Sequence, residues 1–461
     1  MLCLLLCACS GDTPWRYDPG APVQPVGLVA TADNGQVLLS WPAAGNAAAY
    51  NMYYSTSPGV SRTNGTKIGN IFSTSYIQTG LTNNTTYYFV ITSVNSSSES
   101  AESNRVSATP VLPGPYVQDD LTGSWYFNIL VSGTTAGWMR GVLNIDSTGA
   151  VIFSSFVDSS GTSQPPADLF PALLLNSSGN VRDASTGASH FLGVLAANRK
   201  MIIGNASPDG RSQLMAILQK QVPGVTYTNV GDLQGFGNTG GGGRRFIYNQ
   251  IASGSSQEWE FASGQIGRDQ KTEYTTFNAP SNPVKPGNKA SIFSITSDGV
   301  VTESLAGALP QPSVVIEKGF MSADKSVIVG TATDTSGAGP KYVMRIYQLV
   351  NIQFNDTNTF ALSDLAGTYE LIKLLGGTTT LSASGSLTIT ASGVVTFSSY
   401  LDSSGSGSLP SDITFSVDTN GSLTNAADAS LQGKLSYFKD LFVVTRTESV
   451  GNYSLGIGLK R

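Results

Sequence analysis

Most of the chain is built from a sequence pattern that occurs three times. Three segments begin with Asp-Leu and place a glycine two residues after the leucine: Asp120–Tyr126, Asp232–Phe236 and Asp364–Tyr369. Two further stretches, Val151–Gly161 and Val395–Gly405, have nearly the same sequence. Repeats of this kind indicate one structural module that is used several times. We therefore expect three tandem β repeats, at residues 116–221, 230–350 and 363–461.

Each repeat alternates short apolar strands with turn residues. The layout of strand, turn and strand recurs near the end of every repeat, at Gly193–Gly204, Gly319–Gly330 and Gly433–Val444. Charged residues make up only 12% of the chain and glycine accounts for 51 residues, a composition typical of short strands joined by many turns. We predict an all-β fold in which each repeat is an antiparallel meander of seven or eight strands.

Two architectures fit this strand count. An eight-stranded up-and-down barrel in each repeat would leave no open sheet edge. Alternatively, each repeat supplies two four-stranded blades and the three repeats close a six-bladed propeller, since Asp324–Gly330 is typical of a propeller hairpin. Gly123-Ser124-Trp125 resembles the Gly-x-Trp start of lipocalin and avidin barrels. Linkers at residues 222–230 and 351–363 favour separate barrels, and Thr239–Arg245 is a predicted loop.

The cysteines restrict the chemistry of the folded part. Cys3, Cys7 and Cys9 are the three cysteines of the chain, and the remaining residues contain none. A disulfide framework, a cysteine-ligated metal and thiol catalysis are therefore excluded beyond residue 9. We expect stability to come from packing, and we expect no cofactor and no metal.

Residues 1–9 form an apolar run that is too short to span a bilayer, which requires about 20 apolar residues. Leu6-Cys7-Ala8-Cys9 resembles the lipobox of bacterial lipoproteins. The resemblance implies that Cys9 is the lipid attachment site and the first mature residue, so that the membrane is a partner through the lipid. No Lys or Arg precedes the run, and we therefore expect the natural start upstream of Met1.

Residues 10–21 contain several prolines and are predicted to be an extended tether. In the sorting rule of such lipoproteins, an Asp after the lipidated cysteine favours the inner membrane. Ser10 stands there, which implies a lipid anchor in the outer membrane.

Residues 22–112 carry a second recognisable pattern. Apolar residues alternate around Trp41, Met52 and Phe89, which indicates half-buried strands. Leu81 precedes Tyr87 by six residues, and this spacing resembles the corner of fibronectin type III domains in which a tyrosine hydroxyl bonds back to the backbone. Trp41 matches the tryptophan of the second strand in that family. The resemblance implies a β-sandwich that serves as a spacer or docking surface.

Little in the sequence points to catalysis. His190 is the single histidine and is expected to be an ordinary turn or edge residue. Glu258 and Glu260 flank Trp259 and would share one strand face, the minimum for a pair of glycosidase carboxylates, although a solvated edge explains them more simply. Asp158–Gly161, Asp334–Gly337 and Asp402–Gly405 fit Asp-Gly turns better than a calcium loop.

The sequence thus leaves two function classes open. The first is a noncatalytic cell-envelope scaffold that binds an envelope protein or a glycan, with Trp138, Arg140 and Trp259 as candidate contacts. The second is a carboxylate-dependent glycoside hydrolase or a carbohydrate-binding accessory protein. The formal net charge of −5 provides no basic surface for nucleic acid, which we exclude as a partner.

Overall fold

The computed structural model describes residues 20–461 apart from 73, 112–113, 185–190, 208–210, 234–243, 256, 268, 280–290, 306–316, 336–337, 350–359 and 406–412. Cys9, most of the predicted tether and His190 therefore lie outside the described residues. The described part is all β, apart from three short helical turns, η1 (Gln118–Leu121), η2 (Asn229–Leu233) and η3 (Leu362–Leu365). Across these ranges, no helix has the length and apolar character needed to cross a membrane.

The N-terminal domain is a sandwich of two sheets. Seven strands form it: β1 (Val29–Asp33), β2 (Gln36–Ser40), β3 (Ala49–Ser55), β4 (Thr66–Ile71), β5 (Ser75–Gln78), β6 (Tyr87–Val94) and β7 (Val106–Ala108). The sheet β1-β2-β5 packs on the sheet β4-β3-β6-β7. Trp41 and Tyr50 meet edge to face in the core between them. The tyrosine corner predicted from the sequence is present, since the backbone N–H of Thr82 donates to the Tyr87 hydroxyl at 3.2 Å.

Three larger antiparallel sheets follow. The first contains β8 (Gly123–Ser132), β9 (Gly137–Ile145), β10 (Val151–Asp158), β11 (Leu173–Leu175), β12 (Asn180–Asp183), β13 (Leu192–Leu195), β14 (Met201–Ala206) and β15 (Gln213–Lys220). The second contains β16 (Arg244–Gly254), β17 (Trp259–Ile266), β18 (Thr272–Asn278), β19 (Ser291–Ile295), β20 (Val300–Leu305), β21 (Glu317–Met321), β22 (Val327–Asp334) and β23 (Lys341–Leu349). The third contains β24 (Gly367–Gly377), β25 (Leu381–Ile389), β26 (Val394–Phe397), β27 (Leu401–Asp402), β28 (Ile413–Thr414), β29 (Ser416–Val417), β30 (Ser422–Asn425), β31 (Asp428–Leu435), β32 (Leu441–Ser449) and β33 (Asn452–Lys460).

Each of these sheets is curled because its first and last strands are hydrogen-bonded neighbours. In the first sheet the order is β10-β9-β8-β15-β14-β13-β12-β11, and the second sheet repeats it. The prediction of an all-β fold with antiparallel repeats is confirmed. The alternative six-bladed propeller is wrong, because each repeat is one continuous ladder rather than two four-stranded blades.

The curled sheets are barrels with a seam. In the first barrel, β10 and β11 meet only at the bridge between Ala150 and Ala172, and in the second the corresponding bridge joins Lys271 and Ile292. In the third barrel the short strand β28 pairs with β26 at the same place. The expectation that barrel closure removes every sheet edge therefore needs correction, since strands three and four of each repeat separate beyond this contact.

The recurring Asp-Leu motif begins each barrel. The carboxylate of Asp120 accepts a hydrogen bond from the backbone N–H of Val117 at 3.0 Å, and Asp364 does the same for Ala361 at 2.8 Å. Both bonds hold a short helical turn that directs the following leucine into the barrel core. Leu121 and Leu365 are fully buried there. The motif is therefore a structural cap of the barrel.

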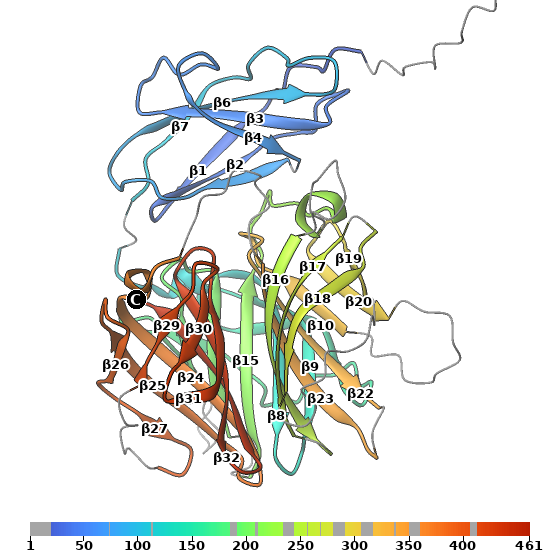
Figure 1. The fold of residues 1–461 in the computed structure, drawn as a ribbon, viewed down its shortest axis with the longest axis vertical. Helices are drawn as coiled ribbons and strands as arrows, with labels where there is room; N and C mark the ends of the chain where they lie inside the picture. The colour runs from blue at the N-terminus through green and yellow to red at the C-terminus, as the bar shows by residue number, and fades with distance from the viewer. Residues whose placement is uncertain are drawn as a thin grey trace, which may run out of the picture.

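The three barrels pack around one shared core (Figure 1). This core contains apolar side chains from all three repeats, among them Met215, Ile346 and Ile457. The strands that supply them are buried on both faces: in β15, Met215 and Ile217 point to the shared core, whereas Leu214, Ala216 and Leu218 fill the first barrel. The expectation of one barrel in each repeat, drawn from the linkers, is confirmed, and the structure adds that the barrels share this core. The linker residue Tyr227 is itself buried in the core of the second barrel.

Two of the three junctions between barrels use the same polar contact. Asn128 on β8 donates to the carbonyl of Val329 in the second barrel at 3.1 Å, and Asn249 on β16 donates to the carbonyl of Gln432 in the third at 3.0 Å. The position in the third repeat that corresponds to both asparagines is Ile372. At this third junction Ser382 instead donates to the Gln213 side chain at 2.7 Å.

The N-terminal sandwich sits over one end of the three-barrel body (Figure 1). Its Asp33 forms an ion pair of 2.5 Å with Lys200, which directly precedes β14. One sequence prediction fails at the start of the second barrel. Arg244 and Arg245 do not belong to a loop, since β16 begins at Arg244, whose buried guanidinium donates to the carbonyls of Asp232 and Lys325.

Candidate functional site

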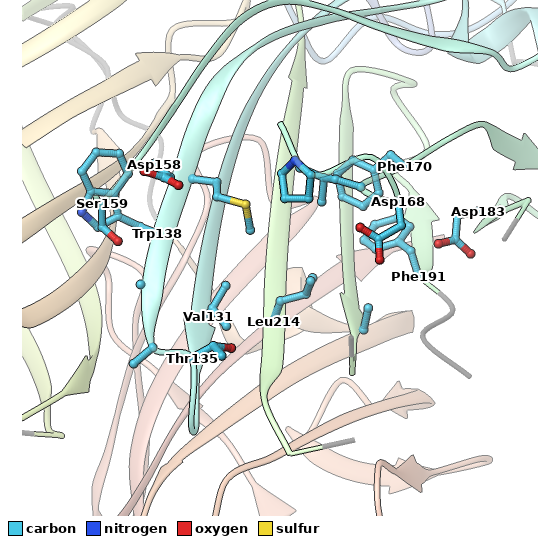
Figure 2. Close-up of a pocket in the computed structure, with 16 residues that line it drawn as sticks. Val131, Thr135, Trp138, Asp158, Ser159, Asp168, Phe170, Asp183, Phe191 and Leu214 are labelled. Atoms are coloured by element: carbon cyan, nitrogen blue, oxygen red, sulfur yellow. The ribbon is translucent and has the colours of Figure 1, made fainter. Parts of the chain in front are cut away.

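The open end of the first barrel contains a cavity of about 340 Å³. Figure 2 shows Trp138 and Asp158 on one side of it, Phe170 and Phe191 on the other, and Leu214 between them. The lining also includes Val131, Met139, Leu169 and Ala206, so that its wall is mainly apolar. The strand β14 runs from Met201, beside the contact with the N-terminal domain, to Ala206 in the cavity wall. The cavity thus lies at the end of the barrel that faces away from the N-terminal domain.

Phe170, in the wall of the cavity, has an unusual backbone conformation. Its φ is +50°, and the next residue is Pro171. A bulky side chain rarely adopts positive φ, and a following proline restricts the residue further. The ring is buried against Phe191, with the two ring centres 4.9 Å apart in an edge-to-face arrangement. Strained backbone of this kind concentrates at functional sites, and Phe170 therefore marks this corner as a candidate site.

The Phe191 ring packs on two glycines. Gly193 on β13 and Gly204 on β14 are direct partners across the two strands. A Cβ atom on either glycine would overlap the Phe191 ring, so the ring occupies the space that side chains would otherwise fill. This packing of an aromatic ring on a glycine pair fixes one wall of the cavity.

The second barrel has charged groups where the first has its cavity. The strand registers place Arg345 at the position of Ala216, Gln250 at that of Ile129 and Glu303 at that of Asp183. The Arg345 guanidinium contacts Glu303 at 3.1 Å and Gln250 at 2.5 Å, and it lies 4.6 Å from the centre of the Tyr248 ring. Burial raises the pKa of Tyr248 well above its ordinary value, and the nearby Glu260 adds to this.

The third barrel also carries an ion pair in its interior. Lys373, at the position of Ile129, lies 2.5 Å from Glu448, and its barrel contains a much smaller cavity of about 70 Å³. Small and apolar residues at the equivalent positions of the first barrel therefore explain why the larger cavity is found there.

The three candidate contacts from the sequence lie at the junctions between barrels. Trp138 lines the cavity, but its indole N–H donates to Thr333 of the second barrel at 2.8 Å. Arg140 stacks on Trp138 at 4.1 Å and donates to the carbonyl of Thr331. Trp259 occupies the matching position in the second repeat, and its indole N–H donates to Thr447 at 2.9 Å.

The glutamates beside Trp259 are ion-paired rather than solvated. Glu258 is buried and contacts Lys341 at 2.6 Å, and Glu260 lies 3.9 Å from Arg345. Burial alone would lower the pKa of Lys341, but the hydrogen bond and charge of Glu258 outweigh burial and raise it. The solvated edge expected for these two residues is therefore wrong.

The predicted Asp-Gly turns are present where the structure describes them. The Asp158 carboxylate accepts hydrogen bonds from the backbone N–H groups of Ser160 and Thr162, each at 2.9 Å, and Gly161 has φ of +84°. Asp402 caps Ser404 in the same way. Within the described ranges, no three His, Cys, Asp or Glu side chains are placed to hold a metal ion.

Sequence reasoning missed Phe170, Phe191 and the acidic residues of the cavity, Asp168 and Asp183. The Phe170-Pro171 dipeptide was a visible signal, since it ends one residue before β11, where a turn is needed. No residue pattern within a single repeat predicts the cavity. A comparison of repeats indicates it, because the first repeat has the small residue Ala216 where the second has Arg345.

Comparison with known proteins identifies the N-terminal domain. Residues 21–109 match the sequence profile of the family "Fibronectin type III domain". The sandwich is therefore a fibronectin type III domain, as the sequence predicts. The match does not extend to the three barrels.

Two curated relatives share a stretch of similar length with the chain. A poly(3-hydroxybutyrate) depolymerase of Ralstonia pickettii is 39% identical over 87 residues, which make up 18% of this chain and 16% of that enzyme. An amylopullulanase of Thermoanaerobacter thermohydrosulfuricus is 39% identical over 95 residues, or 20% of this chain and 6% of that enzyme. The chain thus spans less than a fifth of the length of either relative.

Solved structures with similarity to the chain include the following two. An Fn3-like protein from Clostridium thermocellum is 34% identical, covering 20% of this chain and 92% of its own, with a TM-score of 0.17. The isotype 1 transferrin binding protein B from serogroup B Neisseria meningitidis is 10% identical, covering 81% of this chain and 84% of its own, with a TM-score of 0.21. TM-scores this low support no functional inference.

Proposed function

We propose that this chain is a noncatalytic binding protein of the bacterial envelope, in which the first barrel takes up a small apolar ligand. The observation that carries the proposal is the cavity at the open end of that barrel. Its volume of about 340 Å³ lies within the range usual for small-molecule sites. Apolar and aromatic walls with a few polar groups at the rim are also typical of such sites.

The charged groups support binding rather than catalysis. Glu258, Glu260 and Glu303 contact lysine or arginine side chains at the distances given above. A glycosidase needs one carboxyl group that is protonated and one that faces the substrate. Carboxylates held by cations in a packed interior are suited to stabilising the barrel instead.

Binding is tested by filling the cavity. The neutral fluorescent probe N-phenyl-1-naphthylamine should bind to the wild-type protein with an increase in fluorescence. Leu214→Trp places a larger ring in the cavity wall and should remove most of this signal. Leu401→Trp is the matched control, since Leu401 is half-exposed on the third barrel and should leave the titration unchanged. Equal probe binding by wild type and Leu214→Trp would refute the proposed site.

We also propose that a lipid on Cys9 anchors the chain to the outer membrane. Acyl chains contribute about 0.8 kcal/mol per buried CH₂, so two or three chains hold a domain durably. Cys9→Ser should release the protein into the soluble fraction or leave an unprocessed precursor, whereas Cys7→Ser should stay in the membrane fraction. Membrane fractionation with intact mass spectrometry is the measurement. A wild-type mass without acyl chains would exclude the anchor.

A further inference from the structure

We infer that the cavity of the first barrel selects a compact aromatic ligand, of one or two fused rings, over saturated ligands of equal hydrophobicity. The inference rests on the proposed binding function of this cavity and specifies its ligand class. It is carried by Phe170 and Phe191, whose rings meet in the cavity wall (Figure 2) and are called the aromatic corner below.

The volume of the cavity suits one or two rings. An engineered protein cavity of about 150 Å³ with apolar walls binds benzene. The cavity of the first barrel, at about 340 Å³, has about twice that volume. We therefore expect a fused two-ring ligand to be of the right size.

Both rings of the aromatic corner are held in place before a ligand binds. The Phe191 ring fills the space above Gly193 and Gly204. Phe170 has a φ of +50°, and its ring meets Phe191 edge to face with 4.9 Å between the ring centres. A wall that is already ordered costs little conformational entropy on binding. Such a wall favours a rigid planar ligand over a flexible chain, because the chain loses its own rotational freedom in the cavity.

The aromatic corner also attracts rings more than it attracts saturated groups. Pairs of aromatic rings gain about two- to tenfold in affinity beyond what the buried area provides. Met139 lines the same cavity, and its thioether sulfur makes favourable contacts with aromatic rings. A saturated ligand buries apolar surface in the cavity but makes neither of these contacts.

A comparison of repeats separates the aromatic corner from the frame of the barrel. The second repeat has the same glycine pair, since Gly319 and Gly330 are direct partners on β21 and β22. Two residues before Gly319 stands Glu317, whereas Phe191 stands two residues before Gly193. The barrel frame thus forms without a ring at this position, and we assign the ring to the cavity.

The test uses three neutral alcohols with equal numbers of carbon atoms: 2-naphthalenemethanol, decahydro-2-naphthalenemethanol and 1-undecanol. Each is titrated against the full chain loaded with N-phenyl-1-naphthylamine. Each affinity is then divided by the octanol–water partition coefficient of the alcohol, which removes the general hydrophobic contribution. The normalised affinity of the naphthalene compound should exceed that of either saturated alcohol by at least about threefold.

Two variants identify the residues responsible. Phe191→Leu keeps an apolar side chain but removes the ring, and it should lower the normalised advantage of the naphthalene compound by at least about threefold. Phe170→Leu should act in the same direction, and it carries the test if Phe191→Leu does not fold. The matched control is Phe293→Leu in the second barrel. It removes a buried ring that meets Tyr347 edge to face and should keep the advantage.

The outcomes separate this inference from the proposed function. Dye binding with equal normalised affinities for the three alcohols, or with the highest value for a saturated one, would overturn the aromatic selection and leave the binding cavity in place. Absence of dye binding and of any displacement would overturn both. An advantage that survives in Phe191→Leu and in Phe170→Leu would overturn the assignment to the aromatic corner.

Discussion

Glu99 fixes the connection between β6 and β7 of the fibronectin type III domain through one carboxylate oxygen. This oxygen accepts hydrogen bonds from Asn51 at 3.0 Å, Tyr53 at 2.7 Å and Thr92 at 2.5 Å. Burial alone would raise the pKa of Glu99, but the three hydrogen bonds outweigh it and lower the pKa. Burial and the bond to Glu99 together raise the pKa of Tyr53 to about 12. The ionised carboxylate and the protonated phenol therefore stabilise each other.

This arrangement predicts a pH-dependent loss of stability. Because the folded pKa of Glu99 is lowered, its contribution is present above the unfolded pKa and disappears as the pH falls through the folded value. Glu99→Gln should reduce the free energy of unfolding of this domain by about 1–2 kcal/mol at neutral pH, and the difference from wild type should vanish in acid. The free energy of unfolding is measured at each pH by urea titration, with hydrogen exchange of the β6 amides as the readout.

The matched control for Glu99 is Glu102→Gln in the same connection. Glu102 accepts a hydrogen bond from the backbone N–H of Arg62 at the protein surface, and its replacement should change stability by less than about 0.5 kcal/mol. If the free energies of unfolding of Glu99→Gln and wild type differed by the same amount at neutral and at acid pH, the carboxylate would not carry this stability.

At the scale of elements, the pair β13 and β14 couples the barrel frame to the cavity. The Phe191 ring fills the space above Gly193 and Gly204, so a side chain on the strand forces the ring to move. Gly204→Ala should push Phe191 toward the cavity, cost about 1–3 kcal/mol by overpacking, and weaken dye binding.

Gly456→Ala is the control for this prediction. Gly456 lies at the position of Ala216 in the third barrel, and a Cβ atom there would have its nearest neighbour at 3.3 Å. Thermal unfolding and dye titration of both variants are the measurements. Undiminished dye binding by a folded Gly204→Ala protein would show that Phe191 does not form the cavity wall.

Part of this arrangement could be predicted from the sequence for a physical reason. A strand with one buried face alternates buried and less buried residues, as in β2 just before Trp41, and this strand was predicted correctly. The half-buried strands expected around Met52 and Phe89 are instead buried on both faces over most of their length. Strands such as β15, whose residues Leu214–Leu218 are apolar throughout, are buried on both faces and give no indication of which side meets a neighbouring barrel. The shared core and the position of Trp138 therefore could not be predicted.

At the scale of the whole molecule, the fibronectin type III domain and the three-barrel body have separate cores. Among the residues that the structure describes, the core around Trp41 contains none from the barrels, and the two parts meet through polar contacts such as Lys200 with Asp33. We predict that residues 116–461 fold without residues 22–110. Expression of the fragment and calorimetry test this, and loss of a cooperative thermal transition would show that the two parts depend on each other.

The seam between strands three and four has a consequence for how the repeats can diverge. The hairpins that join strands six and seven have equal lengths in all three repeats, at Leu195–Met201, Met321–Val327 and Leu435–Leu441. The segments that span the seam differ in length, at Asp158–Leu173, Asn278–Ser291 and Asp402–Ile413. Strands that pack on two sides admit few substitutions, whereas a segment outside the ladder can be lengthened at little cost in free energy. One chain can thus carry three barrel mouths of different shape and charge on an unaltered frame, and new specificities can arise at the seam without a new fold.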